Sequence, residues 1–111
     1  MDIDGLLADH TDEIAVLTRR LLERVAAATE WSDQRVYRGW HGVGFHHHDL
    51  GYVVGVFPRV DSARVVFEHG HLLGDAPFLE GNGRTRHVDF TSWDADRIAV
   101  VDDMLDRALA P

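Results

Sequence analysis

The sequence contains no cysteine, and this absence excludes disulfide bonds, thiolate zinc sites and cysteine nucleophiles. No apolar run in the sequence approaches the roughly 18 residues that a membrane-spanning helix needs. The first residues are acidic and too weakly apolar for a secretory signal peptide. We therefore expect a soluble, cytoplasmic protein that has no membrane partner.

An excess of positive charge is also lacking. The chain carries 11 basic and 19 acidic side chains, which give a formal net charge of −8, and it has no lysine-rich patch. Nucleic acids are bound mainly through clustered Lys and Arg side chains. We therefore do not expect a nucleic-acid partner.

What the chain does have is the size and composition of one globular domain spanning residues 1–111, with 45% apolar and 27% charged residues. Histidine is abundant, with eight residues. Protonation of all eight would bring the formal charge from −8 to zero. The solubility of the protein is therefore expected to depend on pH.

Two segments show the three- and four-residue apolar spacing of amphipathic helices, one near each end of the chain. The first is expected to end near Ala28–Glu30. The second has its apolar positions from Ile98 to Leu109. The candidate capping residues are Asp9 or Thr11 for the first helix and Thr91 or Ser92, with Asp94, for the second.

Between these helices the apolar period changes to that of strands. Four runs are rich in β-branched and aromatic residues: Val36–Phe45, Gly51–Phe57, Ala63–His69 and Thr85–Phe90. The first three are separated by short turn-prone segments and predict an antiparallel meander, and the fourth follows a long loop. The expected fold is α+β, with both helices on one face of an antiparallel sheet of about four to five strands, in two layers.

The second half of the chain carries a recognisable pattern. The segment Val65–Val88, VVFEHGHLLGDAPFLEGNGRTRHV, resembles the signature of the YdhG-like domains of unknown function, with its strand end, LEG-x-G turn and final Arg-His-Val. RGWHGVGF and GYVVGVFP resemble the first two strands of that family. Two departures are Ala76, which interrupts the acidic-Pro turn, and Arg84 in place of the family's lysine. The resemblance implies a small α+β domain, and it implies iron handling because some members are described as frataxin-like intracellular iron chaperones.

Three consecutive histidines, His46, His47 and His48, lie in the middle of the chain. Adjacent residues of a strand point to opposite faces, so three imidazoles cannot meet at one ion in an extended segment. At a hairpin tip, two of them together with Asp49 could ligate zinc, nickel, copper or iron. The alternative, which we favour, is a solvated turn whose histidines bind added metal adventitiously.

A second group of candidate metal ligands comes from two predicted strands. Its members are Glu68, His69 and His71 at the end of one strand, and His87 and Asp89 on the other. If these strands are neighbours, two imidazoles and a carboxylate would form a donor set suited to iron or zinc. The alternative is structural, with the histidines bonded to backbone carbonyl groups or to Glu80 and holding the long loop in place.

Two further sets are candidates for binding a small ligand. In GNGRTR, two glycines together with Arg84 and Arg86 could present backbone N–H groups and guanidinium groups to an anion. The alternative is a tight turn with positive φ at the glycines, in which Arg84 or Arg86 pairs with a nearby acid such as Glu80. Trp40 and His41 could line a pocket, and the alternative for them is packing in the core.

No Ser–His–Asp spacing or paired-carboxylate motif stands out in the sequence, so we expect a non-catalytic domain. One hypothesis is that it binds a divalent metal ion, iron or zinc, or a small ligand. The rival hypothesis is a protein-interaction module that docks a protein partner or a second copy of the chain as a homodimer.

Overall fold

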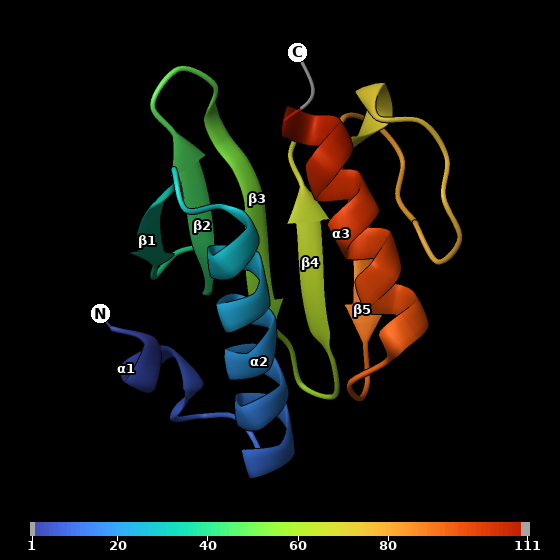
Figure 1. Cartoon of the computed structure of the whole chain (residues 1–111). Coiled ribbons are helices and arrows are strands. Elements are labelled where there is room, and N and C mark those ends of the chain that lie inside the picture. The colour runs from blue at the N-terminus through green and yellow to red at the C-terminus, as the bar shows by residue number, and fades with distance from the viewer. Residues whose placement is uncertain (1, 110–111) are drawn as a thin grey trace.

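Five strands form one antiparallel sheet in the computed structural model, which describes residues 2–109 (Figure 1). The strands are β1 (Asp33–Tyr37), β2 (Gly42–His47), β3 (Gly51–Pro58), β4 (Ala63–Phe67) and β5 (Arg86–Phe90). Their order across the sheet is their order in the chain, so each strand pairs with the next one. The expected meander is therefore present, and β5 joins its last strand.

The helical elements are α1 (Ile3–Leu7), α2 (Asp12–Ala28), a short 3-10 helix η1 (Gly70–Leu72) and α3 (Ala95–Leu109). The Thr11 hydroxyl caps α2 by accepting a hydrogen bond from the backbone N–H of Ile14 at 3.3 Å. Helix α2 packs on β3 and β4, and α3 packs on β5. Both long helices lie over the same face of the sheet (Figure 1), which confirms the predicted α+β, two-layer arrangement.

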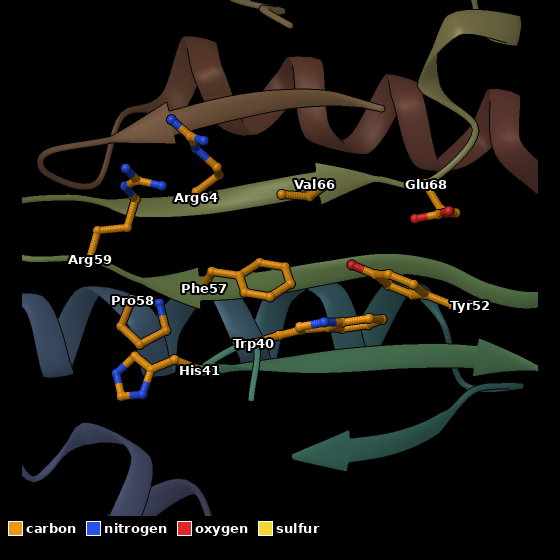
Figure 2. Close-up of a pocket in the computed structure, with 9 residues that line it drawn as sticks. All are labelled: Trp40, His41, Tyr52, Phe57, Pro58, Arg59, Arg64, Val66 and Glu68. Atoms are coloured by element: carbon orange, nitrogen blue, oxygen red, sulfur yellow. The ribbon is translucent and has the colours of Figure 1, made fainter. Parts of the chain in front are cut away.

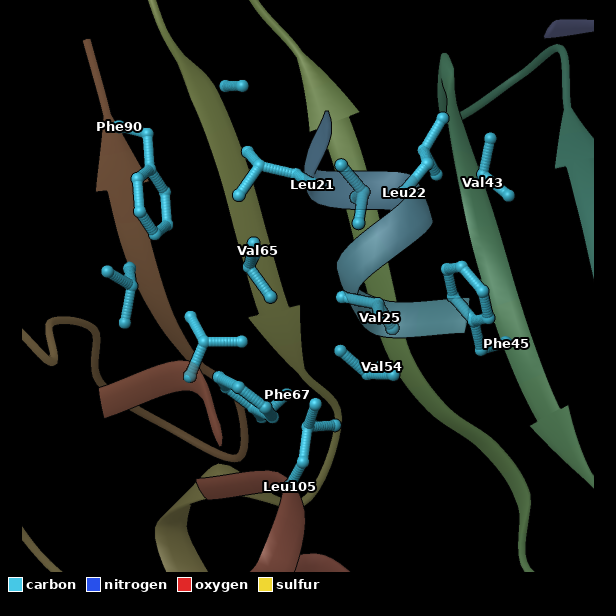
Figure 3. Close-up of a cluster of buried hydrophobic side chains, with 14 of the residues drawn as sticks. Leu21, Leu22, Val25, Val43, Phe45, Val54, Val65, Phe67, Phe90 and Leu105 are labelled. Carbon is cyan, nitrogen blue, oxygen red and sulfur yellow. The ribbon is translucent and has the colours of Figure 1, made fainter. Parts of the chain in front are cut away.

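The hydrophobic core fills the space between this face and the two helices (Figure 3). Alternate residues of each strand point into it, as the two-residue period of a strand requires. On β4 and β5 these are Val65, Phe67, Val88 and Phe90, all buried. The helices add the buried side chains of Leu21, Leu22, Val25, Val101, Met104 and Leu105.

The prediction of one strand over Val36–Phe45 is wrong, because this segment contains parts of two strands joined by a turn. The backbone N–H of His41 donates to the carbonyl oxygen of Arg38 at 3.3 Å, which closes a four-residue turn. His41 itself has φ of +54°, in the left-handed region that a strand does not contain. The aromatic residues of RGWHGVGF therefore follow a hairpin and not one extended run.

Smaller differences concern the ends of elements. Strand β4 ends at Phe67, earlier than expected, because the chain then turns into η1. Asp94, and neither Thr91 nor Ser92, supplies the cap of α3, since its carboxylate accepts hydrogen bonds from the first backbone N–H groups of the helix. Helix α1 has only five residues and was not predicted. Within residues 2–109, no helix combines the length and the apolar character needed to cross a membrane.

Replacement of Phe67 tests the core. Phe67 is 1% exposed, so Phe67→Ala removes a buried ring and leaves a cavity. We expect the free energy of unfolding, measured by urea denaturation, to fall by about 3–5 kcal/mol. The control Val60→Ala changes a side chain that is 89% exposed and should alter the free energy by about 0.5 kcal/mol or less. Equal effects of the two substitutions would contradict this description of the core.

Candidate functional site

The second face of the sheet is covered by neither long helix (Figure 1), and glycines let aromatic rings lie directly on its backbone. Gly44 and Gly55 are neighbours on β2 and β3. A Cβ atom added to Gly55 would lie 2.3 Å from the Tyr52 hydroxyl and 2.6 Å from the Phe57 ring, and one added to Gly42 would lie 2.2 Å from the same ring. Rings therefore occupy the space that Cβ atoms would need. We call this surface the open face.

An exposed tryptophan extends the aromatic layer of the open face. Trp40 comes from the turn between β1 and β2, with its ring centroid 4.9 Å from that of Tyr37 and 6.0 Å from that of Tyr52. It is nevertheless 61% exposed. An indole held between two other rings and left open to water offers a flat apolar surface for contact.

These rings form part of a pocket of about 370 Å³ on the open face (Figure 2). Its lining comes from the turn between β1 and β2, from β3 and β4, and from the residues that directly follow these two strands. It consists of Trp40, His41, Tyr52, Phe57, Pro58, Arg59, Arg64, Val66 and Glu68. Figure 2 shows Arg59 and Arg64 at one end and Tyr52 and Glu68 at the other. The pocket thus has an apolar middle, a cationic end and an end with hydrogen-bonding groups. Trp40 and His41 line this pocket and are not part of the hydrophobic core, which was the alternative for them.

The two arginines of the cationic end differ in their partners. Arg64 Nε and Nη2 donate to the two carboxylate oxygens of Asp89 at 2.7 and 3.1 Å, a bidentate pair between neighbouring strands. This hydrogen bonding lowers the pKa of Asp89 and raises the pKa of Arg64. Arg59 is exposed and forms no ion pair within residues 2–109. Its charge is therefore free to meet a ligand.

At the opposite end, the hydroxyl of Tyr52 is buried and has no hydrogen-bond partner in the described part of the chain. Burial raises the pKa of Tyr52, and the charge of the nearby Glu68 adds to the shift, so the phenol keeps its proton. One carboxylate oxygen of Glu68 accepts a hydrogen bond from Arg84. This end therefore offers one unused donor, and Glu68 retains a second oxygen as an acceptor.

A histidine pair borders the cationic end. His10 donates from Nδ1 to the carbonyl oxygen of Arg59 at 3.1 Å, and its Nε2 lies 2.6 Å from Nε2 of His41. A neutral imidazole carries a single N–H, and that of His10 is on Nδ1. Nε2 of His10 can therefore only accept, so His41 Nε2–H is the donor of the second bond. The pair ties the loop before α2 to the turn that carries Trp40.

Two clusters of metal-ligating groups occur within residues 2–109. The first, His47, His48 and Asp49, lies at the tip of the hairpin between β2 and β3, in agreement with the predicted position. His46 instead lies within β2, where its Nε2 is hydrogen-bonded to the Tyr37 hydroxyl. The second consists of Glu80, His87 and Asp89, whose ligand atoms lie within 4.8 Å of one another. Burial lowers the pKa of His87, and the charge of Arg64 lowers it further.

The structure separates the other residues proposed as ligands from this second cluster. His71 donates from Nδ1 to the carbonyl oxygen of Arg84 at 2.8 Å and holds the long loop, and His69 is the exposed residue before η1. Glu68 is paired with Arg84. The condition set for this group, that its two strands are neighbours, is met by β4 and β5, but Glu68 already lies beyond the end of β4 at Phe67.

The GNGRTR loop follows the turn alternative. Gly81 and Gly83 have φ of +117° and +69°. Arg86 donates to the carbonyl oxygens of Gly83 and Thr85, both at 2.8 Å, so its guanidinium secures the loop. Arg84 pairs with Glu68, not with the suggested acid Glu80. Neither arginine lines the pocket of Figure 2.

Sequence reasoning did not identify Tyr52, Phe57 and Arg59 as site residues. A signal for the first two was present, because glycines at Gly42, Gly44 and Gly55 leave space on one face of adjacent strands for large rings. No comparable signal marks Arg59, since it lies in the turn after β3 and reaches the pocket only through tertiary structure.

Comparison with known proteins gives no match to a family model, to a curated protein or to a solved structure. The resemblance of Val65–Val88 to the YdhG-like domains therefore stays a prediction.

A methyl group on the open face tests how the rings are held. Gly55→Ala places its Cβ within contact distance of Tyr52 and Phe57, so the rings must move. We expect a loss of about 1–3 kcal/mol of stability and large NMR shifts of both aromatic side chains. Gly39→Ala is the matched control, because nothing lies within 4 Å of its Cβ. Unperturbed ring signals in Gly55→Ala would contradict the close packing.

The titration of His46 provides a second test. Burial lowers the pKa of His46, Arg35 lowers it further, and Asp33 opposes the shift. We expect Arg35→Gln to raise this pKa and Asp33→Asn to lower it, as followed by NMR of the imidazole protons. Because the folded-state pKa lies below the unfolded value of about 6.5, protonation of His46 should destabilise the fold as the pH falls below that value. Shifts of the same sign in both variants would contradict this assignment.

Proposed function

We propose that this protein is a non-catalytic binding domain whose open face holds a small, flat ligand that carries an acidic group. The observation that carries the proposal is the aromatic pocket with Arg59 at one end, a cation with no ion-pair partner within residues 2–109 (Figure 2). Ligand sites are concave and mainly apolar, with a few polar groups that fix orientation. The pocket of about 370 Å³ has this character.

The apolar middle of the pocket supplies most of the contact. A planar ring laid against Trp40 and Phe57 removes apolar surface from water on both partners, and offset stacking adds to that gain. Glycines beneath Phe57 hold its ring against the sheet. The site therefore needs little ordering on binding, which favours affinity.

The polar ends set the orientation. Arg59 meets the acidic group of the ligand, and Arg64 adds positive charge beside it even while paired with Asp89. At the other end Tyr52 offers a hydrogen-bond donor and Glu68 an acceptor. A hydroxyl group satisfies both, because it accepts one hydrogen bond and donates another. The ligand class is therefore a small aromatic acid with a hydroxyl group at its far end.

The residues of the lining support binding over catalysis. None of them is a serine, threonine or cysteine. Carboxylates can also act as nucleophiles, but that of Glu68 is paired with Arg84. The imidazole of His41 is engaged by His10. We keep homodimerisation through the open face as the rival proposal, since exposed Trp40 would also suit contact with a second copy. Iron handling rests on the family resemblance alone.

The direct test is an NMR titration with para-hydroxyphenylpropanoate. We expect a dissociation constant on the order of 1 mM for a ligand of this size, with shifts at Trp40, Tyr52 and Phe57. Its neutral amide should bind roughly tenfold more weakly, because it loses a charge-assisted hydrogen bond. Phenylpropanoate, which lacks the hydroxyl, should also bind more weakly.

Arg59→Gln should remove the preference for the acid over the amide. Arg38→Gln is the matched control, because Arg38 is exposed and lies outside the pocket. Equal binding of acid and amide by the wild-type protein would overturn the proposal. Trp40 signals that respond to protein concentration and not to the ligand would favour the homodimer.

A further inference from the structure

The cluster of Glu80 from the long loop and His87 and Asp89 from the outer strand β5 lies beside the pocket and not within its lining. Nε2 of His87 is 3.7 Å from Oε2 of Glu80 and 3.8 Å from Oδ2 of Asp89. One imidazole nitrogen thus faces two carboxylates, one from its own strand and one from the long loop.

The backbone fixes this arrangement. Glu80 and His87 exchange two backbone hydrogen bonds, each of 2.9 Å, so the loop runs briefly as an additional strand along β5. His87 and Asp89 are two residues apart on β5 and therefore point to the same face. The three side chains start from positions that hydrogen bonding between backbones holds in place.

Their spacing suits a divalent ion. With bonds of roughly 2.0–2.2 Å, two ligands of a tetrahedral zinc ion lie about 3.4 Å apart, so the observed 3.7 and 3.8 Å need only a small contraction. An imidazole with two carboxylates is a donor set for borderline metals such as Zn²⁺. The side chain of Glu80 is 70% exposed, which leaves a path for the ion and for water ligands.

A cation already competes for this cluster. Arg64 lies opposite Asp89 in the register of β4 and β5 and holds both carboxylate oxygens of that residue. A metal ion that takes one of these oxygens must weaken the bidentate pair and repel the guanidinium. Arg64 also lines the cationic end of the pocket, so a guanidinium displaced from Asp89 can pair with an anion that is bound there.

We infer that Glu80, His87 and Asp89 bind a divalent transition-metal ion in competition with Arg64, and that the displaced Arg64 then binds the acidic group of the ligand in the pocket. The binding of the acidic ligand by displaced Arg64 rests on the proposed function, whereas the metal site does not. Metal and acidic ligand therefore bind cooperatively, because each one favours the release of Arg64 from Asp89.

The metal site is tested with Zn²⁺ alone, by calorimetry and amide NMR, in a background variant with His47→Ala and His48→Ala that removes the hairpin cluster. Arg64→Gln should bind Zn²⁺ more tightly, by roughly tenfold, because the competing charge is gone. Arg64→Lys keeps the charge without the bidentate geometry, so its affinity for Zn²⁺ should lie between those of the background variant and Arg64→Gln. Arg38→Gln is the charge-matched control and should leave the affinity nearly unchanged.

His87→Ala should abolish Zn²⁺ binding in the same background. Unchanged or weaker binding in Arg64→Gln would overturn the inference, as would Zn²⁺ shifts that survive His87→Ala. Because Arg64→Gln leaves Asp89 without its partner, its amide spectrum and unfolding midpoint are recorded first. If this variant does not fold, the Zn²⁺ affinities of Arg64→Lys and Arg38→Gln are compared instead, and tighter binding by Arg64→Lys supports the competition.

Coupling to the pocket is tested by titrating para-hydroxyphenylpropanoate with and without saturating Zn²⁺. We expect Zn²⁺ to tighten binding severalfold in the background protein and to have no effect in Arg64→Gln. Tightening in both would mean that the metal contacts the probe directly and would overturn the transfer of Arg64. No binding of the probe under either condition would overturn the proposed function and the transfer together, while the Zn²⁺ titration still decides the metal site.

Discussion

The structure depends on a sheet whose two long helices, α2 and α3, lie on the same face (Figure 1). The buried face is closed by α2 and α3, whereas the open face must be covered by side chains of the sheet itself. Glycines on β2 and β3 make this cover possible, because the rings of Tyr37, Tyr52 and Phe57 lie where Cβ atoms would otherwise be. Backbone hydrogen bonds stay shielded under the rings, and two of these rings, Tyr52 and Phe57, also line the pocket.

The architecture was accessible from the sequence because its signals are local. The apolar spacing of α2 and α3 and the β-branched composition of β3 and β4 follow from periodicity alone. The division between β1 and β2 was not accessible in the same way. Its turn contains Trp40 and His41, residue types common in strands or cores, and His41 adopts a left-handed conformation that is unusual for a residue with a Cβ.

The candidate site was accessible only in part, for a related reason. Trp40, His41, His87 and Asp89 were identified as residue types, but their surroundings depend on which strands are neighbours and which face each side chain occupies. Arg59 joins the pocket through tertiary packing. Glu80 joins His87 because the loop pairs with β5 over a single bridge. His69 instead precedes η1 and His71 lies within it, since the chain turns away after β4.

The two outer strands end the sheet in different ways. The single bridge between Glu80 and His87 places loop backbone along β5, so part of that edge has no free donors or acceptors to offer. Among the described residues, no strand covers the edge of β1 in this way. Its residues Asp33, Gln34 and Arg35 are exposed and polar, and two of them form an ion pair. Charged side chains on a short edge strand discourage the addition of further strands. A sheet so rich in valine and aromatic residues is therefore protected from edge-to-edge aggregation at both of its margins.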